Sequence, residues 1–83
     1  METSVHFSSI LVTASPPDFP LCVKGLESLP GIEVHLRYPE HGRIVVVQET
    51  ESAEDQQEGL RRIQATPGVL SAELVYHYID SEE

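Results

Sequence analysis

The chain contains two Pro-Gly steps, at residues 30–31 and 67–68, and an apolar, strand-like run follows each of them. The first reads "LPGIEVHL" and the second "TPGVLSAELVYHY". Proline disfavours helical geometry in the residue before it, and glycine accepts the positive φ that commonly closes a helix. The two steps therefore predict two equivalent units, in each of which a helix ends and a strand begins.

Four segments have the composition of strands. Residues 5–14 are apolar and β-branched without glycine or proline, and residues 69–78 resemble them. Residues 32–38 alternate apolar and polar side chains, which is typical of an antiparallel strand with one buried face. Residues 43–49 are almost continuously apolar and so predict a central strand, joined to the preceding strand by the turn "PEHG".

The first helix is predicted after the segment "SPPDFP", which stops the first strand. Ser15 or Asp18 can cap this helix, and prolines are tolerated in its first turn because those amides lack intrahelical partners. The apolar positions recur at helical spacing and form one stripe: Phe19, Cys22 or Val23, Leu26 and Leu29.

The second helix is predicted to begin at Ser52, because Asp55 three residues later completes a pattern like a capping box. Gly59 weakens the interior of this helix and indicates a close approach of the helix to the sheet. The inner stripe of the helix is predicted to contain Gln56, Leu60 and Ile63.

The resulting order is β-α-β-β-α-β, which predicts an α+β fold of the ferredoxin-like type. Right-handed crossovers place both helices on one face of a four-stranded antiparallel sheet, with the first and third strands in the centre. The length suits a single domain over residues 1–83, and the acidic residues from about 79 to 83 are predicted to be a frayed tail.

Alternation along the strands sorts the side chains into two faces. The face toward the helices is predicted to hold Ile10, Val12, Ala14, Ile32, Val34, Leu36, Ile44, Val46, Leu70, Ala72, Leu74 and Tyr76. The face without helices is predicted to hold Ser9, Leu11, Thr13, Glu33, His35, Arg37, Val45, Val47, Glu49, Ser71, Glu73, Val75 and His77. On that second face Leu11, Val45 and Val47 form an apolar strip with glutamates at its edges, and such a strip tends to mark an interaction site.

Composition excludes several classes of function. The net charge of -9 argues against a nucleic-acid partner, which needs a basic surface. Cys22 is the single cysteine, the four histidines are dispersed, and there is no glycine-rich phosphate loop, so we expect neither an enzyme nor a metal or cofactor site. No apolar run is long enough to cross a membrane, and the first residues lack the basic region of a secretory signal, so we expect a cytoplasmic protein.

Four segments of the chain resemble the NapD family, in the order in which that family has them: "SSILVTA", "LPGIEVH", "GRIVVVQE" and "PGVLSAELVYHY". The last segment is the most specific of the four. The resemblance implies a ferredoxin-like chaperone without a cofactor of its own. Such a chaperone binds the twin-arginine (Tat) signal peptide of NapA, the catalytic subunit of the periplasmic nitrate reductase, and holds back export until the molybdenum cofactor is inserted.

The resemblance and the face assignment together predict which residues bind the signal peptide. The face without helices would take the apolar part of the peptide, and its glutamates would pair with the arginines. The predicted binding residues are Leu11, Thr13, Glu33, His35, Val45, Val47, Glu49, Glu73, Val75 and His77. On this reading the protein is a monomer or a weak homodimer.

Two other functions remain open from the residues alone. Ferredoxin-like domains also serve as small-molecule regulatory modules and as dimerisation modules, and an uncovered sheet suits either role. The three prolines of "SPPDFP" stiffen the loop that would border a small ligand, which disfavours the regulatory module.

Overall fold

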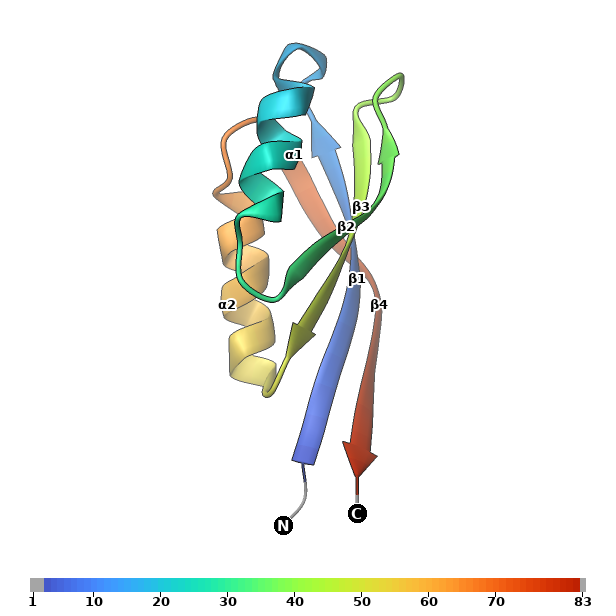
Figure 1. Ribbon diagram of the computed structural model, residues 1–83, viewed down its shortest axis with the longest axis vertical. Helices are drawn as coiled ribbons and strands as arrows, with labels where there is room; N and C mark the ends of the chain where they lie inside the picture. Colours follow the sequence, from blue (N-terminus) through green and yellow to red (C-terminus); the bar gives the residue numbers. More distant parts are fainter. Residues whose placement is uncertain (1–2, 83) are drawn as a thin grey trace.

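The computed structural model describes residues 3–82 and has the predicted order of elements (Figure 1). The elements are β1 (Thr3–Ala14), the short 3₁₀ turn η1 (Pro16–Asp18), α1 (Phe19–Glu27), β2 (Ile32–Tyr38), β3 (Arg43–Thr50), α2 (Ala53–Gln64) and β4 (Val69–Glu82). The strands form one antiparallel sheet in the order β2-β3-β1-β4. Both helices lie on the same side of this sheet (Figure 1), so the ferredoxin-like prediction is confirmed.

The glycines of the two Pro-Gly joints have the predicted positive φ, but they lie three residues beyond the helix C-caps, Ser28 and Ala65, and so lead into the strands rather than cap the helices. Gly31 and Gly68 both have positive φ, at 75° and 91°. A side chain at Gly31 would also lie 2.9 Å from the backbone oxygen of Glu49, so this joint is held closely against the end of β3. Glycine is required there for its conformation and for the space.

The core lies between the helices and the central strands. Its buried apolar residues are Ile10, Val12, Ala14, Phe19, Cys22, Leu26, Ile44, Val46, Ile63 and Ala72. The two central strands contribute half of this set, because helices cover them on one side along most of their length.

The helix starts differ from each other. Ser52 caps α2 as predicted, since its hydroxyl oxygen accepts a hydrogen bond from the backbone N–H of Asp55 at 3.1 Å. Neither Ser15 nor Asp18 makes a side-chain cap, and the backbone N–H of Asp18 instead donates to the carbonyl of Ser15 at 2.9 Å. A 3₁₀ turn with prolines therefore leads into α1 without a capping side chain.

β1 and β4 continue as a two-stranded ribbon beyond the start of α2 (Figure 1), which contributes to a molecule of 47 × 18 × 17 Å. In this ribbon Val5 pairs with Asp80 and His6 with Ile79. The frayed tail predicted from about residue 79 is therefore replaced by strand up to Glu82, while residue 83 lies outside the described residues.

β4 contains a bulge at Val75 that changes which side chains face the helices. Ile10 pairs with Leu74 but Ser9 pairs with Tyr76, so Val75 is an extra residue without a partner in the ladder. An extra residue reverses the alternation of the side chains that follow it. The predictions for Tyr76 and His77 are both wrong for this reason: Tyr76 lies on the face without helices, and His77 lies on the helix side beside Ser8.

β2 contains a second bulge, at His35, with the same effect. Val34 pairs with Val46 and Leu36 with Val45, so the alternation reverses after His35. Leu36 therefore lies on the face without helices, and Arg37 lies on the helix side, where its guanidinium pairs with Glu27 of α1 at 3.0 Å. The predictions had these two residues the other way round.

A third irregularity lies at the start of β4. Thr13 pairs with Ser71 and Ala14 with Val69, which leaves Leu70 between them without a partner in the ladder. Leu70 is 68% exposed, so its predicted place in the core is wrong, and Val69 packs against the core instead.

Candidate functional site

The sheet face opposite the helices, called the open face from here on, carries side chains from all four strands. The pairing registers assign to it Phe7, Ser9, Leu11 and Thr13 of β1, Glu33, Leu36 and Tyr38 of β2, Arg43, Val45, Val47 and Glu49 of β3, and Ser71, Glu73, Tyr76 and Tyr78 of β4. No helix of residues 3–82 covers this face (Figure 1).

The centre of the open face is apolar. Leu11 lies opposite Val45 across the β1–β3 ladder, and Val47 is the next residue of β3 on the same face. These three side chains are half-buried although no helix covers them, because they shield one another. Leu36 extends the strip onto β2, where it pairs with Val45. The predicted apolar strip is thus present and is wider than the sequence indicated.

Three aromatic side chains continue the open face onto the β1–β4 ribbon. The rings of Phe7 and Tyr78 stack with their centroids 5.1 Å apart, and Tyr76 lies 5.8 Å from Tyr78 in a tilted arrangement. Tyr76 is 60% exposed. We call Phe7, Tyr76 and Tyr78 the aromatic ladder. The sequence alone does not predict the aromatic ladder, because the Tyr-x-Tyr spacing places both tyrosines on one face but only the bulge at Val75 decides which face.

Acidic side chains lie beside the apolar strip. Glu33 pairs with Val47 in the β2–β3 ladder, and Glu49 lies opposite Phe7 in the β1–β3 ladder. These four residues line one hollow of about 280 Å³ at the end of the sheet near Gly31. Glu73 lies on the other side of the strip, opposite Leu11.

Seven of the ten predicted binding residues lie together on the open face. They are Leu11, Thr13, Glu33, Val45, Val47, Glu49 and Glu73. His35 and Val75 occupy the two bulges, where they have no partner in the ladder. His77 lies on the helix side, where its ring stacks on His6 at 5.4 Å and its Nε2 lies 3.2 Å from Nδ1 of His6.

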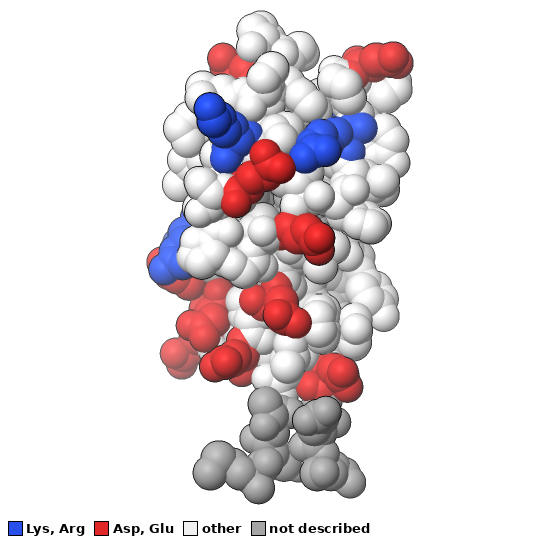
Figure 2. All heavy atoms as spheres, viewed as in Figure 1, with Lys and Arg blue, Asp and Glu red and all other residues white. Residues whose placement is uncertain are grey.

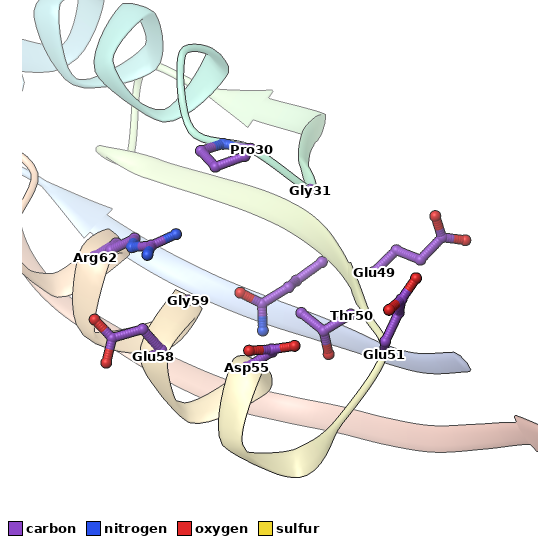
Figure 3. A pocket seen from close by; sticks show the side chains of 10 residues that line it. Pro30, Gly31, Glu49, Thr50, Glu51, Asp55, Glu58, Gly59 and Arg62 are labelled. Carbon is purple, nitrogen blue, oxygen red and sulfur yellow. The ribbon is translucent and has the colours of Figure 1, made fainter. Parts of the chain in front are cut away.

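A second hollow, of about 270 Å³, lies on the helix side between α2 and the end of β3 (Figure 3). Its lining residues include Glu49, Glu51, Asp55 and Glu58 together with Arg62. Glu49 lines this hollow and the hollow on the open face, so it joins the two acidic regions.

Charge is distributed unevenly along the molecule. In the view of Figure 2, Lys and Arg lie near α1 and the β2–β3 turn and at the side of α2, and Asp and Glu dominate the surface toward the chain ends. With fourteen acidic against five basic residues in the chain, this acidic surface carries a strong negative potential.

Residues 3–82 contain no group of three or more His, Cys, Asp and Glu side chains arranged to hold a metal ion. No helix in that range has the length and apolar character needed to span a membrane.

A family profile described as NapD protein matches residues 5–81. The chain belongs to the NapD family. A solved relative supports the assignment: the NapD of E. coli, described as a Tat proofreading chaperone, is 29% identical, with a TM-score of 0.86 over 94% of this chain and 82% of that one. The NapD family and this likeness confirm the prediction of a chaperone rather than an enzyme.

Other comparisons concern the fold alone. E. coli AsnC is 23% identical and superposes with a TM-score of 0.67, over 94% of this chain and 50% of that one. No curated protein sequence matched the chain. The NapD assignment therefore depends on the family profile and on the solved E. coli chaperone.

Proposed function

We propose that this NapD-type chaperone binds the Tat signal peptide of NapA on its open face. Binding in the cytoplasm holds back export of the nitrate reductase subunit until its molybdenum cofactor is inserted. The chaperone contributes a binding surface to this process and needs no cofactor of its own. Membership of the NapD family and the likeness to an E. coli Tat proofreading chaperone support the proposal.

The observation that carries the proposal is an uncovered apolar strip with carboxylates beside it. A twin-arginine signal has a basic start followed by a moderately apolar stretch, so its receptor needs an apolar surface with acids at one end. Leu11, Val45 and Val47 provide the apolar surface, and Glu33 and Glu49 provide the acids.

A helical signal peptide suits this surface. The sheet has helices on one side only, and a peptide helix with one apolar side would add a layer on the other side (Figure 1). Each 100 Å² of apolar area removed from water stabilises the complex by roughly 2.5 kcal/mol before the losses of freedom on binding are subtracted. Thr13 and Glu73 lie at the border of this surface and are proposed to contact the peptide there.

Calorimetric titration with a synthetic NapA signal peptide tests the proposal. The titration is made at low and at moderate salt, and a peptide with both arginines changed to glutamine is the control. Affinity should fall in the control and should fall with salt for the native peptide, because exposed ion pairs are screened. No binding of either peptide to folded protein would refute the proposal.

Amide chemical shifts locate the peptide in the same titration. The proposal expects shifts at open-face residues such as Leu11 and Val45. Shifts confined to α1 and α2 would place the peptide on the wrong side of the sheet and contradict the proposal.

The same uncovered strip also suits a second copy of the chain, as in a dimerisation or regulatory module. Sedimentation velocity separates the two functions. A stable dimer at micromolar concentration, unchanged by the signal peptide, would favour self-association. A monomer or a weak dimer that the peptide dissociates fits the chaperone.

A further inference from the structure

The two ends of the open face differ in charge. At the end near Gly31, Glu49 lies opposite Phe7, and Glu33 is nearby on β2. At the other end Arg43 lies opposite Thr13. Glu40 lies in the β2–β3 turn, so this second end carries both signs of charge whereas the first is acidic.

The acidic end also presents an aromatic ring. Phe7 lines the hollow together with Glu33, Val47 and Glu49. Tyr78 stacks on Phe7 at 5.1 Å with an interplanar angle of 18°, and this contact fixes the orientation of the Phe7 ring.

The two carboxylates of this hollow are available to a ligand. The ion pairs in the described part of the chain are Arg37 with Glu27 and Arg61 with Glu58. Glu33 and Glu49 belong to neither pair, and both side chains are exposed. A cation from another molecule can therefore reach them without displacing an internal partner.

We propose that this hollow holds the guanidinium of one arginine of the twin-arginine pair, stacked on Phe7 and paired with Glu33 and Glu49. The inference rests on the proposed function and names its specificity residues. A guanidinium is planar, stacks on aromatic rings and pairs with carboxylates through two N–H groups. A lysine ammonium is a compact point charge that gains less from this combination, so the hollow prefers arginine over lysine.

This placement sets the direction of the bound peptide. The arginines precede the apolar stretch of a Tat signal, so the beginning of the peptide lies at Phe7. The apolar stretch then runs over Leu11 and Val45 toward the β2–β3 turn. The reverse direction would bring the arginines beside Arg43 and away from the carboxylates of Glu33 and Glu49.

The test compares two signal peptides, one with the Arg-Arg pair and one with Lys-Lys, on three variants of the protein. Phe7→Leu keeps an apolar side chain but removes the ring. Glu33→Gln removes one exposed carboxylate inside the hollow. Glu40→Gln removes one exposed carboxylate outside the hollow and is the matched control. Melting temperatures show that each variant is folded before affinities are compared.

The proposal expects Phe7→Leu to lower affinity for the Arg-Arg peptide about two- to fivefold, the range of an exposed cation–π contact, with little change for Lys-Lys. Glu33→Gln should weaken binding of both peptides more than Glu40→Gln does. If Phe7→Leu and the native protein prefer the Arg-Arg peptide over the Lys-Lys peptide by the same factor, the guanidinium site is overturned. In that outcome the peptides still bind. Failure of the proposed function is a different outcome, because neither peptide then binds the native protein.

A spin label at the start of the peptide tests the direction. It should broaden the amide signals of Phe7 and Glu49 and leave those of Thr13 and Arg43 sharp. Broadening at Thr13 and Arg43 instead would show the reverse direction and overturn the assignment.

Discussion

The substitution Gly59→Ala tests how closely α2 packs on the sheet. Gly59 lies in the middle of α2, where alanine would ordinarily stabilise a helix by up to about 1 kcal/mol. In this protein a Cβ at residue 59 would collide with the side-chain oxygen of Gln48 and would lie 2.7 Å from its Cδ. The sequence already indicated a close approach at this glycine, and the structure names the group that causes it.

The collision should outweigh the gain in helix propensity. Gln48 is 1% exposed, and its Nε2 donates a hydrogen bond to the carbonyl of Gln56 at 3.1 Å. Moving this side chain leaves buried polar atoms unpaired and crowds its neighbours, and the two effects together cost about 2–4 kcal/mol. We expect a net loss of about 1–3 kcal/mol in the free energy of unfolding, which lowers the melting temperature by roughly 5–20 °C.

Urea denaturation of four proteins measures the effect: the native chain, Gly59→Ala, Gln48→Ala and the double variant. Gln48→Ala removes the obstructing amide, so the added methyl should be much less harmful in that background. The double-variant cycle should therefore show a favourable coupling of about 1 kcal/mol or more, because the two residues are in contact. A Gly59→Ala protein more stable than the native chain, with no coupling to Gln48, would refute the reasoning.

Three shorter predictions concern other parts of the chain. Ser52→Ala removes the cap on the Asp55 amide and should lower the free energy of unfolding by about 1 kcal/mol in the same urea assay, whereas Ser52→Asp should retain it. Burial, and secondarily the Asp18 carboxylate, raises the pKa of the Cys22 thiol. As the pH rises, the unfolded chain therefore loses this proton before the folded chain does, so the free energy of unfolding should fall above the ordinary thiol pKa. A Cys22→Ala variant whose free energy of unfolding has the same pH dependence would contradict this. Tyr76→Ala should change the free energy of unfolding by less than about 0.5 kcal/mol, because the ring is exposed; a loss of about 3 kcal/mol or more would place Tyr76 in the core.

The order of elements could be predicted because it depends on local chemistry. Proline and glycine follow both helices within a few residues, Ser52 caps α2, and apolar runs form the strands, so each boundary has a local cause. The central strands could also be assigned to faces correctly. β1 and β3 pair without a register shift from His6 to Thr13, so simple alternation holds there.

The edge strands could not be assigned in the same way, because a bulge is decided by the partner strand. His35 and Val75 look like ordinary strand residues, and nothing in their neighbours' identities shows that they lack a partner. Each bulge reversed the faces of the residues after it. The apolar strip on β1 and β3 was therefore predicted, whereas the places of Leu36 on β2 and of the two ladder tyrosines on β4 were not.

The positions of the bulges favour the open face over the sheet edges as the place where a peptide binds. All three register shifts lie in ladders that involve β2 or β4, the two edge strands, and the β1–β3 ladder has none over its paired residues. A peptide added as a fifth strand needs a regular row of unpaired N–H and C=O groups, and bulges interrupt such a row. The same bulge at Val75 turns Tyr76 and Tyr78 onto the open face, so the feature that impairs the edge of β4 also enlarges the surface available to a helical peptide.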